Sequence, residues 1–318
     1  MMDELLLKND NKVIFLILDG LGDIPNPPFD LKTPLEAAKK PNMDGLAVQR
    51  GVLGRIIPVD VGITPGSGPG HLSLFGYDPQ VHEIGRGVLE VLGLNMKLKD
   101  GDLAARANFC TIKEGLVTDR RAGRIPTSET ERLCGLISSE IKEVEGCEVI
   151  VKPGKSHRFA VIFRGKDLTD RLTDADPHKD NKPLTYTSAK APEAGFSARV
   201  VNSFMERVMV LLKAEPVANG ALLRGFSLKP DITPFTEKFA MKALAIATYP
   251  MYRGIAKVLG MDVRDEPANY DEAVSILKKN YNDYQFFFFH VKETDLAGED
   301  GNFEEKVQAI ENDDRLLP

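Results

Sequence analysis

The sequence predicts an α/β protein in which a mainly parallel sheet, with helices on both faces, is interrupted by an inserted α+β domain. Two strongly apolar segments, Val13–Leu18 and Gln285–Val291, lie near opposite ends of the chain. Such runs are typical of strands buried on both faces of a parallel sheet. Strands alternate with helices at both ends, whereas the middle is rich in strands, and this change of pattern indicates the insertion.

The first residues after Val13–Leu18 predict the start of this alternation. Leu35–Arg50 has helical spacing interrupted near Pro41, and Gly54–Val61 has the pattern of a strand. A Gly/Pro-rich turn follows, and His71–Phe75 is expected to begin a helix. In the last third of the chain the alternation returns. Strands are expected over Ala221–Arg224 and Ala243–Ala247, and helices over Pro250–Leu259, Tyr270–Asn282 and Phe303–Leu317.

The middle of the chain predicts a separate domain. Its strands are expected over Leu103–Ile112, Gly115–Asp119, Glu148–Lys152 and Arg158–Arg164. Ser128–Glu131 fits a capping box that opens a helix running to about Val144, and an amphipathic helix spans roughly Glu193–Ala214. We therefore assign residues 98–229 to the inserted domain, and residues 1–97 and 230–318 to a discontinuous core.

The bulk composition excludes several classes of protein. The chain of 318 residues has a net charge of −6, which argues against a general nucleic-acid binder. Three widely spaced cysteines indicate neither a disulfide framework nor a zinc ribbon. The first residues lack the positive region of a signal peptide, and the apolar runs are too short to span a bilayer. We therefore expect a cytoplasmic protein without nucleic-acid or membrane partners.

Carboxylates follow both of the strongly apolar segments. Asp19 comes directly after Val13–Leu18, and Asp295 and Glu299 come shortly after Gln285–Val291. Open parallel sheets bind ligands at the carboxyl ends of their strands, and carboxylates there suit hard or borderline divalent cations. The alternatives are a turn at Asp19, because Asp-Gly is common turn chemistry, and a helix cap at Asp295 or Glu299.

Ser67 stands among glycines and prolines directly before the helix expected at His71–Phe75. The start of a helix presents backbone N–H groups and a positive dipole to an incoming phosphate. Because a free serine is a poor nucleophile, Ser67 would need a base or a metal to react. The alternative is a flexible loop, and we expect His71 to pack or hydrogen-bond rather than to bind a ligand.

Arginines gather in the predicted inserted domain. Together with one histidine, they are Arg120, Arg121, Arg124, His157, Arg158 and Arg224. Arginine binds carboxylate and phosphate groups through two parallel hydrogen bonds. In an acidic protein this group indicates a small polyanionic substrate, and the alternative is a solvated basic turn.

Short motifs are spread along almost the whole chain. They are LDGLGD at Leu18–Asp23, TPLEAA at Thr33–Ala38, PNMD at Pro41–Asp44, GSGPGHLSLFGYDP at Gly66–Pro79, NF at Asn108–Phe109, TDRRAGRI at Thr118–Ile125, HR at His157–Arg158, DADPH at Asp174–His178, LLRG at Leu222–Gly225 and KETDLAG at Lys292–Gly298. In number and order, these motifs resemble those of the archaeal-type cofactor-independent phosphoglycerate mutases of the alkaline phosphatase superfamily.

The resemblance implies a phosphatase-like core that binds metal and an inserted domain that binds substrate. It implies that 3-phosphoglycerate and 2-phosphoglycerate are interconverted, in glycolysis or gluconeogenesis, through a phosphoserine at Ser67. Two divalent metal ions are expected and 2,3-bisphosphoglycerate is not; manganese is the expected ion, with magnesium, cobalt or zinc as alternatives. Asp19, Ser67 and Asp295 carry over as metal ligands, and Glu299 stands where many relatives have a histidine.

The resemblance also implies roles for the inserted domain. His157 is a candidate general acid or base, with a structural role as the alternative. The substrate, a small phosphorylated carboxylic acid, is expected to bind to Asp119, Arg120, Arg121, Arg124, Arg158 and Arg224. Whether the chain forms a homo-oligomer stays open.

The sequence departs from the family pattern near its end. Such a core needs an Asp-His pair and a further histidine from a downstream segment, and the sequence stops at Pro318 before any such segment. We therefore expect a chain that is truncated relative to the family. Our hypothesis is that the family chemistry belongs to the full-length protein, whereas this chain binds metal poorly and is inactive. The alternative functions are another phosphomutase, a phosphatase or a phosphonate hydrolase of the same superfamily, or a non-catalytic binding protein.

Overall fold

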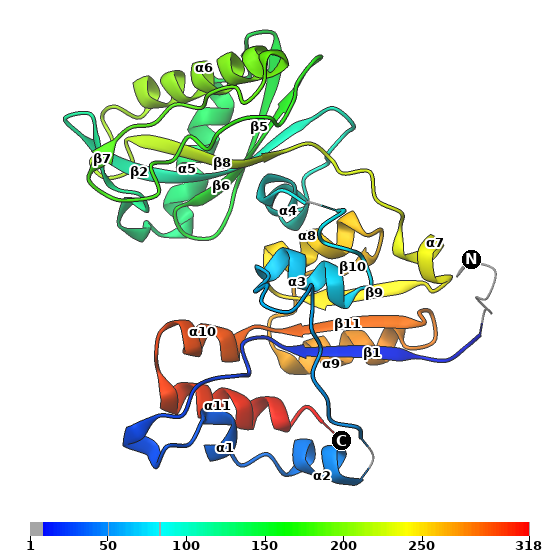
Figure 1. Ribbon diagram of the computed structural model, residues 1–318. Coiled ribbons are helices and arrows are strands. Elements are labelled where there is room, and N and C mark those ends of the chain that lie inside the picture. The colour runs from blue at the N-terminus through cyan, green and yellow to red at the C-terminus, as the bar shows by residue number, and fades with distance from the viewer. Residues whose placement is uncertain (1–8, 50, 83, 318) are drawn as a thin grey trace. The chain divides into compact units, whose positions relative to one another are not determined.

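The computed structural model describes residues 9–49, 51–82 and 84–317, and the chain forms two compact units (Figure 1). The first unit consists of Met1–Pro65 and Thr233–Pro318, so both ends of the chain build it. The second unit, Gly66–Ile232, is continuous in sequence. A discontinuous unit is therefore interrupted by an inserted one.

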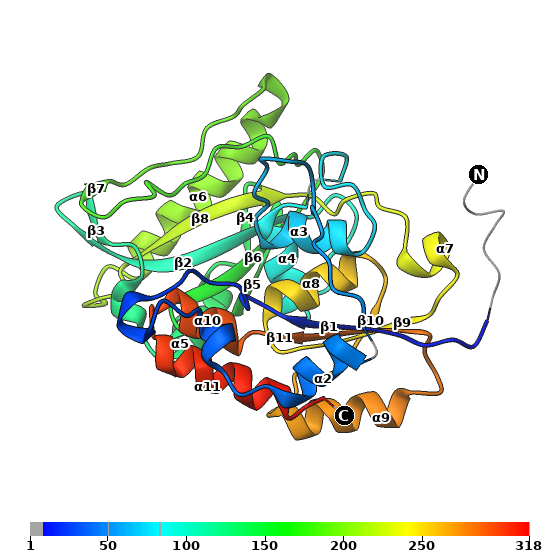
Figure 2. The ribbon, with the colours of Figure 1, turned by 60° about the horizontal axis from the view of Figure 1, so that its bottom comes forward.

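The first unit is built around a parallel four-stranded sheet with the strand order β1-β11-β9-β10. Its strands are β1 (Val13–Leu18), β9 (Ala243–Ala247), β10 (Asp262–Val263) and β11 (Phe286–Val291). All residues of β9 and β11 are buried, as expected for strands covered on both faces. The same expectation for Val13–Leu18 is wrong, because β1 stands at the end of the strand order, none of its residues is buried and Ile14 is exposed. Figure 2 shows α8 (Pro250–Val258) on one side of this sheet, and α9 (Tyr270–Asn280) and α11 (Phe303–Asp314) on the other. The predicted parallel sheet with helices on both faces is confirmed.

Short helices complete the first unit. They are η2 (Pro27–Phe29), α1 (Pro34–Ala37), α2 (Pro41–Gln49), α7 (Phe235–Phe239) and α10 (Glu293–Glu299). A capping box begins α1, because the Thr33 hydroxyl accepts a hydrogen bond from the Glu36 backbone N–H and the Glu36 carboxylate accepts one from that of Thr33. The predicted interruption near Pro41 is confirmed, because a proline can begin a helix but cannot continue one.

The predicted strand over Gly54–Val61 is wrong. This segment has no strand, and Ile56, Ile57 and Val61 are exposed. A strand is stable only when a neighbour satisfies its backbone hydrogen bonds, and no strand of the described part of the chain pairs with this segment. Apolar, β-branched residues give the segment a preference for extended conformation, but the preference does not suffice without a pairing partner.

The second unit is built around an antiparallel seven-stranded sheet. Its strands are β2 (Leu103–Lys113), β3 (Leu116–Asp119), β4 (Glu143–Val144), β5 (Cys147–Pro153), β6 (Arg158–Arg164), β7 (Lys182–Pro183) and β8 (Gly220–Ser227). The strand β2 is central, because it pairs with β3, β6 and β8. Glu114 and Gly115 have positive φ in the turn between β2 and β3, which is the geometry of a tight hairpin.

Six helical segments belong to the described part of the second unit, and α4, α5 and α6 pack against its sheet. They are α3 (Ser67–Leu74), α4 (Arg86–Gly93), η3 (Ala122–Arg124), α5 (Thr127–Glu140), η4 (Pro192–Ala194) and α6 (Gly195–Leu211). Side chains of α5 and α6, such as Leu133 and Phe204, share one apolar core with Phe109 and Phe163 of the strands. No helix in the described ranges is long and apolar enough to cross a membrane.

The structure differs from the sequence prediction in four details of the second unit. Residues 66–97, which the prediction places in the core, lie in this unit because α4 packs against β2 and β8. The predicted capping box at Ser128–Glu131 is wrong, because α5 already begins at Thr127 and no side chain caps it. The Thr127 hydroxyl instead accepts a hydrogen bond from the Ser156 backbone N–H at 3.0 Å. The helix ends before β4, which pairs with β5 instead of extending α5 to Val144. Finally, β8 belongs to this sheet rather than to the returning α/β alternation. The metal-binding and substrate-binding roles of the two units stay predictions.

Candidate active site

Asp19 and Asp295 lie close together in the first unit, at the carboxyl ends of neighbouring parallel strands. Asp19 follows β1, and Asp295 lies in the first turn of α10, which follows β11. Gly20 has a φ of 69°, and a Cβ atom there would lie 2.6 Å from the Asp295 Cα. A glycine is therefore required for the two loops to approach this closely, and the structure brings these two predicted residues together.

The Lys292 ammonium bridges the two carboxylates. Its Nζ lies 3.2 Å from Oδ2 of Asp19 and also forms an ion pair with Asp295. Burial lowers the pKa of Lys292, but the hydrogen bond with Asp295 and the charge of Asp19 outweigh it, so the pKa rises above its usual value. Lys292 is therefore a permanent cation that the two carboxylates share.

Asp19 is kept ionised and oriented by several donors. Burial alone would raise the pKa of Asp19, but hydrogen bonds from His290 and Tyr252 and the charge of Lys292 lower it well below its usual range. The Tyr252 hydroxyl donates to Oδ2, and Nε2 of His290 lies 3.4 Å from the same oxygen. The Thr294 hydroxyl donates to the Asp19 carbonyl oxygen. A carboxylate that is charged and fixed in this way suits a bound cation.

This cluster supplies part of what a divalent metal ion needs. Asp19 and Asp295 offer carboxylate oxygens, and the contacts of Lys292 show that both can reach a single positive charge. Within the described residues, no group of three or more His, Cys, Asp or Glu side chains is arranged to hold a metal ion. Glu299 is exposed, and Ser67 belongs to the second unit. Of the four predicted metal ligands, the structure therefore brings together Asp19 and Asp295.

Ser67 is the first residue of α3 and is exposed. Gly66 precedes it in an extended conformation, so the backbone N–H groups of the first turn can face an anion. One turn later, Nδ1 of His71 lies 2.8 Å from the Ser67 carbonyl oxygen. The expected hydrogen-bonding role of His71 is confirmed, because this buried ring contacts the backbone of the helix.

Arg106 and Arg224 face each other on β2 and β8 in the second unit. Like charges in directly opposite positions destabilise a sheet. Burial and the charge of Arg106 lower the pKa of Arg224, and the buried Nε of Arg224 has no hydrogen bond to any described residue. Glu90 lies 3.8 Å from Arg106, and Asp176 lies 3.8 Å from Arg224. Each guanidinium thus has a carboxylate nearby, and two like charges on neighbouring strands favour binding of an anion at this position.

The turn after β3 holds the predicted arginines. The Asp119 carboxylate accepts hydrogen bonds from two backbone N–H groups of this turn, at 2.7 and 2.6 Å. Arg120 extends to the buried Asp176, whereas Arg121 and Arg124 are exposed. Asp119 thus stabilises the turn, and of these arginines the structure brings Arg120 next to Arg224 through Asp176.

His157 is buried among positive charges. Burial and the neighbouring Arg158, Arg121 and Arg106 lower the pKa of His157 to about 4. The ring is therefore neutral at pH 7 and can donate one hydrogen bond and accept another. An anion bound nearby would offset the arginines and raise this pKa, which would make the ring a better proton acceptor.

Sequence reasoning missed several residues of these clusters, among them Lys292, Asp176, Tyr252 and Arg106. Lys292 and Asp176 lie inside the motifs KETDLAG and DADPH, which signal that these segments matter but not which side chain acts. Tyr252 and Arg106 carry no such signal, because each stands alone in an amphipathic helix or a mostly apolar strand.

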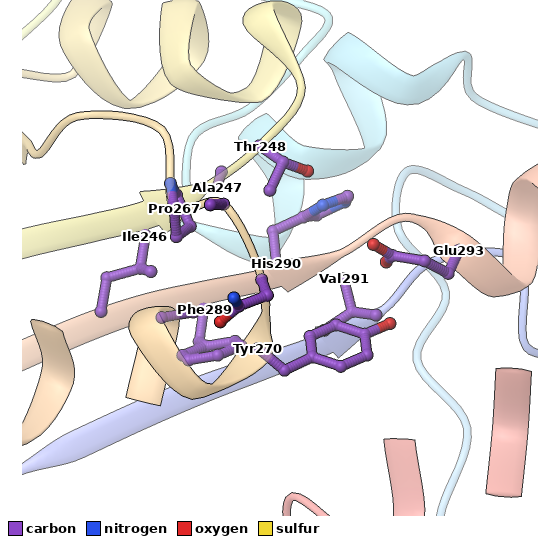
Figure 3. A pocket seen from close by; sticks show the side chains of 12 residues that line it. Ile246, Ala247, Thr248, Pro267, Tyr270, Phe289, His290, Val291 and Glu293 are labelled. Carbon is purple, nitrogen blue, oxygen red and sulfur yellow. The ribbon is translucent and has the colours of Figure 1, made fainter. Parts of the chain in front are cut away.

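A cavity of about 280 Å³ lies in the first unit at the ends of β9 and β11 (Figure 3). His290, Tyr270 and Glu293 line it among mostly apolar neighbours, and Figure 3 shows the Tyr270 hydroxyl on the side of Glu293. Asp313 is fully buried beside Tyr270, and burial together with the charge of Glu293 raises the pKa of Asp313 to about 7. The residues predicted for the active site do not line this cavity.

Relatives of known description match nearly the whole chain. Residues 48–218 match the family model of 2,3-bisphosphoglycerate-independent phosphoglycerate mutases. A probable enzyme of this description from Thermotoga maritima is 48% identical over 317 residues, which cover 100% of this chain and 78% of the relative. Another from Aquifex aeolicus is 47% identical, with 100% of this chain and 79% of the relative covered.

Solved structures share the fold. The cofactor-independent phosphoglycerate mutase of Thermoplasma acidophilum is 34% identical with a TM-score of 0.69, and the match covers 96% of this chain and 82% of that one. A protein from Pyrococcus horikoshii is 30% identical with a TM-score of 0.77, and the match covers 96% and 77%. These likenesses confirm the predicted fold class and resemblance. The chain belongs to the family of 2,3-bisphosphoglycerate-independent phosphoglycerate mutases.

Proposed function

We propose that this chain is an isomerase that interconverts 3-phosphoglycerate and 2-phosphoglycerate through a phosphoserine at Ser67. The observation that carries the proposal, together with the family, is the pair of Arg106 and Arg224 on neighbouring strands, whose side chains are 15% and 21% exposed. Such a pair suits a small substrate that bears both a carboxylate and a phosphate. The proposal includes a role in glycolysis or gluconeogenesis, a cytoplasmic location and independence from 2,3-bisphosphoglycerate.

The proposed substrate site lies in the second unit. Its predicted residues are Asp119, Arg120, Arg121, Arg124, Arg158 and Arg224, and Arg106 joins them because it lies opposite Arg224. Forked hydrogen bonds from arginines would fix the carboxylate of the substrate and leave its phosphate oriented for transfer. His157, neutral and hydrogen-bonding, is the proposed acid or base for the substrate hydroxyl.

The proposed nucleophile is the Ser67 hydroxyl at the start of α3. It loses its proton as its oxygen attacks the phosphorus of 3-phosphoglycerate, the bond from phosphorus to the C3 oxygen breaks, and the C3 oxygen takes up a proton. The C2 hydroxyl then loses its proton and attacks the phosphoserine, the bond from phosphorus to the Ser67 oxygen breaks, and that oxygen takes up a proton, which restores Ser67 and yields 2-phosphoglycerate. Exclusion of water is essential, because water at the phosphoserine would turn the enzyme into a phosphatase.

Two divalent metal ions are part of the proposal, with manganese first and magnesium, cobalt or zinc as alternatives. Their proposed ligands are Asp19, Ser67, Asp295 and Glu299. Bound cations supply a lower pKa for the serine hydroxyl and neutralise phosphoryl charge. Lys292 already holds Asp19 and Asp295 in reach of one positive charge, and it must withdraw from them when another cation binds there.

The experiment follows phosphorus after the chain is mixed with Mn²⁺ and 3-phosphoglycerate. Formation of 2-phosphoglycerate without inorganic phosphate, observed by ³¹P NMR, supports a mutase, and mass spectrometry should find a phosphoryl group on Ser67. Release of inorganic phosphate would instead indicate a phosphatase. Binding without any reaction would agree with the expected inactivity of a truncated chain or indicate a non-catalytic protein, and the same assay on a full-length relative distinguishes the two. A reaction with other phosphate or phosphonate esters alone would indicate a different member of the superfamily.

A further inference from the structure

A fully buried carboxylate joins two arginines of the proposed substrate site. The Asp176 side chain has no exposed surface. Arg120 donates to both of its oxygens, from Nε to Oδ1 and from Nη2 to Oδ2, each at 2.7 Å. Nε of Arg224 lies 3.8 Å from the same Oδ2. The backbone N–H of His178 donates to Oδ1 at 2.9 Å, so the carboxylate itself is held in place.

The backbone around Asp176 is fixed to the strand that carries Arg224. Ala175 and Leu223 exchange backbone hydrogen bonds at 2.8 and 3.2 Å. The Asp174 carboxylate accepts a hydrogen bond from the Gly225 backbone N–H at 2.9 Å. The position of Asp176 relative to β8 is therefore set by the two residues that precede it, which is what a positioning residue requires.

We propose that Asp176 is a positioning residue that fixes the guanidinium groups of Arg120 and Arg224 for the substrate anion. The inference rests on the proposed function, because it assumes that these arginines bind 3-phosphoglycerate. Asp176 acts through the arginines and does not touch the substrate. Arg120 spends two N–H groups on Asp176, and its remaining N–H groups stay available for a ligand.

Because Asp176 is negatively charged, the inference predicts whether removal of this charge weakens or tightens binding of the substrate anion. A carboxylate inside an anion site repels the anion, so its removal should tighten binding if charge were its only contribution. If Asp176 positions the arginines, its removal frees Arg120 to adopt other conformations and brings Arg224 and Arg106 into less compensated repulsion. Removal should then weaken binding although the site becomes more positive.

The test is the affinity of the whole chain for 3-phosphoglycerate, measured by calorimetry for the unaltered protein and for Asp176→Asn. We expect roughly 10- to 100-fold weaker binding in the variant, the range for loss of a charged hydrogen bond. Asp102→Asn is a matched control in the same unit. Asp102 is also buried, and Arg164 donates to its two oxygens at 2.9 and 2.7 Å. The control should lose comparable stability and keep its affinity.

Equal or tighter binding by Asp176→Asn overturns the inference. So does weaker binding that the control shares, because the effect would then be one of general stability. If Asp176→Asn does not fold, Arg120→Lys replaces it, since lysine keeps the charge but cannot form the two parallel bonds; unchanged affinity of that variant overturns the inference. If the unaltered chain does not bind 3-phosphoglycerate, the proposed function fails and the inference fails with it.

Discussion

The charged clusters of the two units are built on the same plan with opposite signs. In the first unit, the Lys292 cation bridges the carboxylates of Asp19 and Asp295. In the second, the Asp176 carboxylate lies between the guanidinium groups of Arg120 and Arg224. Each cluster holds two like charges close together by means of one opposite charge. Such an arrangement suits a ligand whose charge has the same sign as that of the bridging group: a cation in the first unit and an anion in the second.

The two bridging groups differ in how firmly they are held. Asp176 has a short side chain, fully buried and fixed by a backbone N–H group. Lys292 has a long, flexible side chain that is 12% exposed. A lysine can withdraw at the cost of a few rotamer changes, whereas the aspartate cannot leave its place. The comparison teaches that the first unit is suited to exchange its cation, and the second to keep its arginines oriented.

The largest expected effect tests whether the two clusters serve one reaction. Ser67→Ala removes the hydroxyl that is to carry the phosphoryl group, and we expect turnover of 3-phosphoglycerate to fall by at least ~10³-fold. Affinity for 3-phosphoglycerate should stay unchanged, because the arginine cluster is intact. Turnover is measured by ³¹P NMR and affinity by calorimetry. Retained turnover would show that the proposed nucleophile is wrong, and lost affinity would show that Ser67 contributes to binding instead.

The contrast between the units extends to the effect of pH on stability. The folded chain keeps His157 neutral down to about pH 4, whereas the unfolded chain protonates it near 6.5. Stability therefore falls as the pH is lowered through this window, because the unfolded state binds the extra proton.

Asp313, in the first unit, changes stability with pH in the opposite direction. Its pKa of about 7 lies above the usual 3.8, so the folded state holds a proton that the unfolded state has lost, and stability falls as the pH rises from 4 to 7.

Two variants separate these contributions. His157→Gln should remove the loss of stability that occurs as the pH falls below 6.5, and Asp313→Asn should remove the loss that occurs as the pH rises from 4 to 7. Each loss amounts to about 2–3 kcal/mol in the free energy of unfolding. Urea unfolding at pH 5 and pH 8 measures both. Identical pH profiles for a variant and the unaltered chain would contradict the assigned pKa shift of that group.

A smaller effect is expected where like charges face each other. Arg224→Met should weaken binding of 3-phosphoglycerate by roughly 10- to 50-fold, because one charged hydrogen bond is lost. The free energy of unfolding should stay equal or increase, because the repulsion with Arg106 across β2 and β8 is removed. Calorimetry and urea unfolding measure the two quantities. A large loss of stability at unchanged affinity would mean that Arg224 is a structural residue.

Much of the fold could be predicted from the sequence because burial leaves a periodic trace. The continuous apolar runs of β1 and β11 reveal strands of the parallel sheet, although only β11 is buried along its whole length, and Gly115 marks the hairpin between β2 and β3. Gly54–Val61 shows the limit, because propensity cannot name a pairing partner. The start of α5 shows another, because Thr127 forms a hydrogen bond with Ser156, far along the chain.

The site could be predicted only in part, for a related reason. Motifs point to Asp19, Asp295 and Arg120, since these stand at strand ends and turns. The bridging groups Lys292 and Asp176 acquire their roles from contacts between distant segments, such as that between Asp176 and Arg120. Sequence patterns record local preference, whereas charge compensation is a property of the folded unit.

The smallest effect concerns the exchange of the cation in the first unit. Lys292→Met leaves Asp19 and Asp295 in reach of each other without a shared charge, and should lower stability in the absence of metal by about 1 kcal/mol. Added Mn²⁺ should then raise the melting temperature of the variant more than that of the unaltered chain, because no ammonium competes for the carboxylates. The matched control is Lys229→Met, which removes an exposed ion pair with Asp100 and should leave the response to Mn²⁺ unchanged. An equal response of Lys292→Met and the control would show that the two carboxylates do not receive the metal, and the mirror relation between the two clusters would then be one of charge alone.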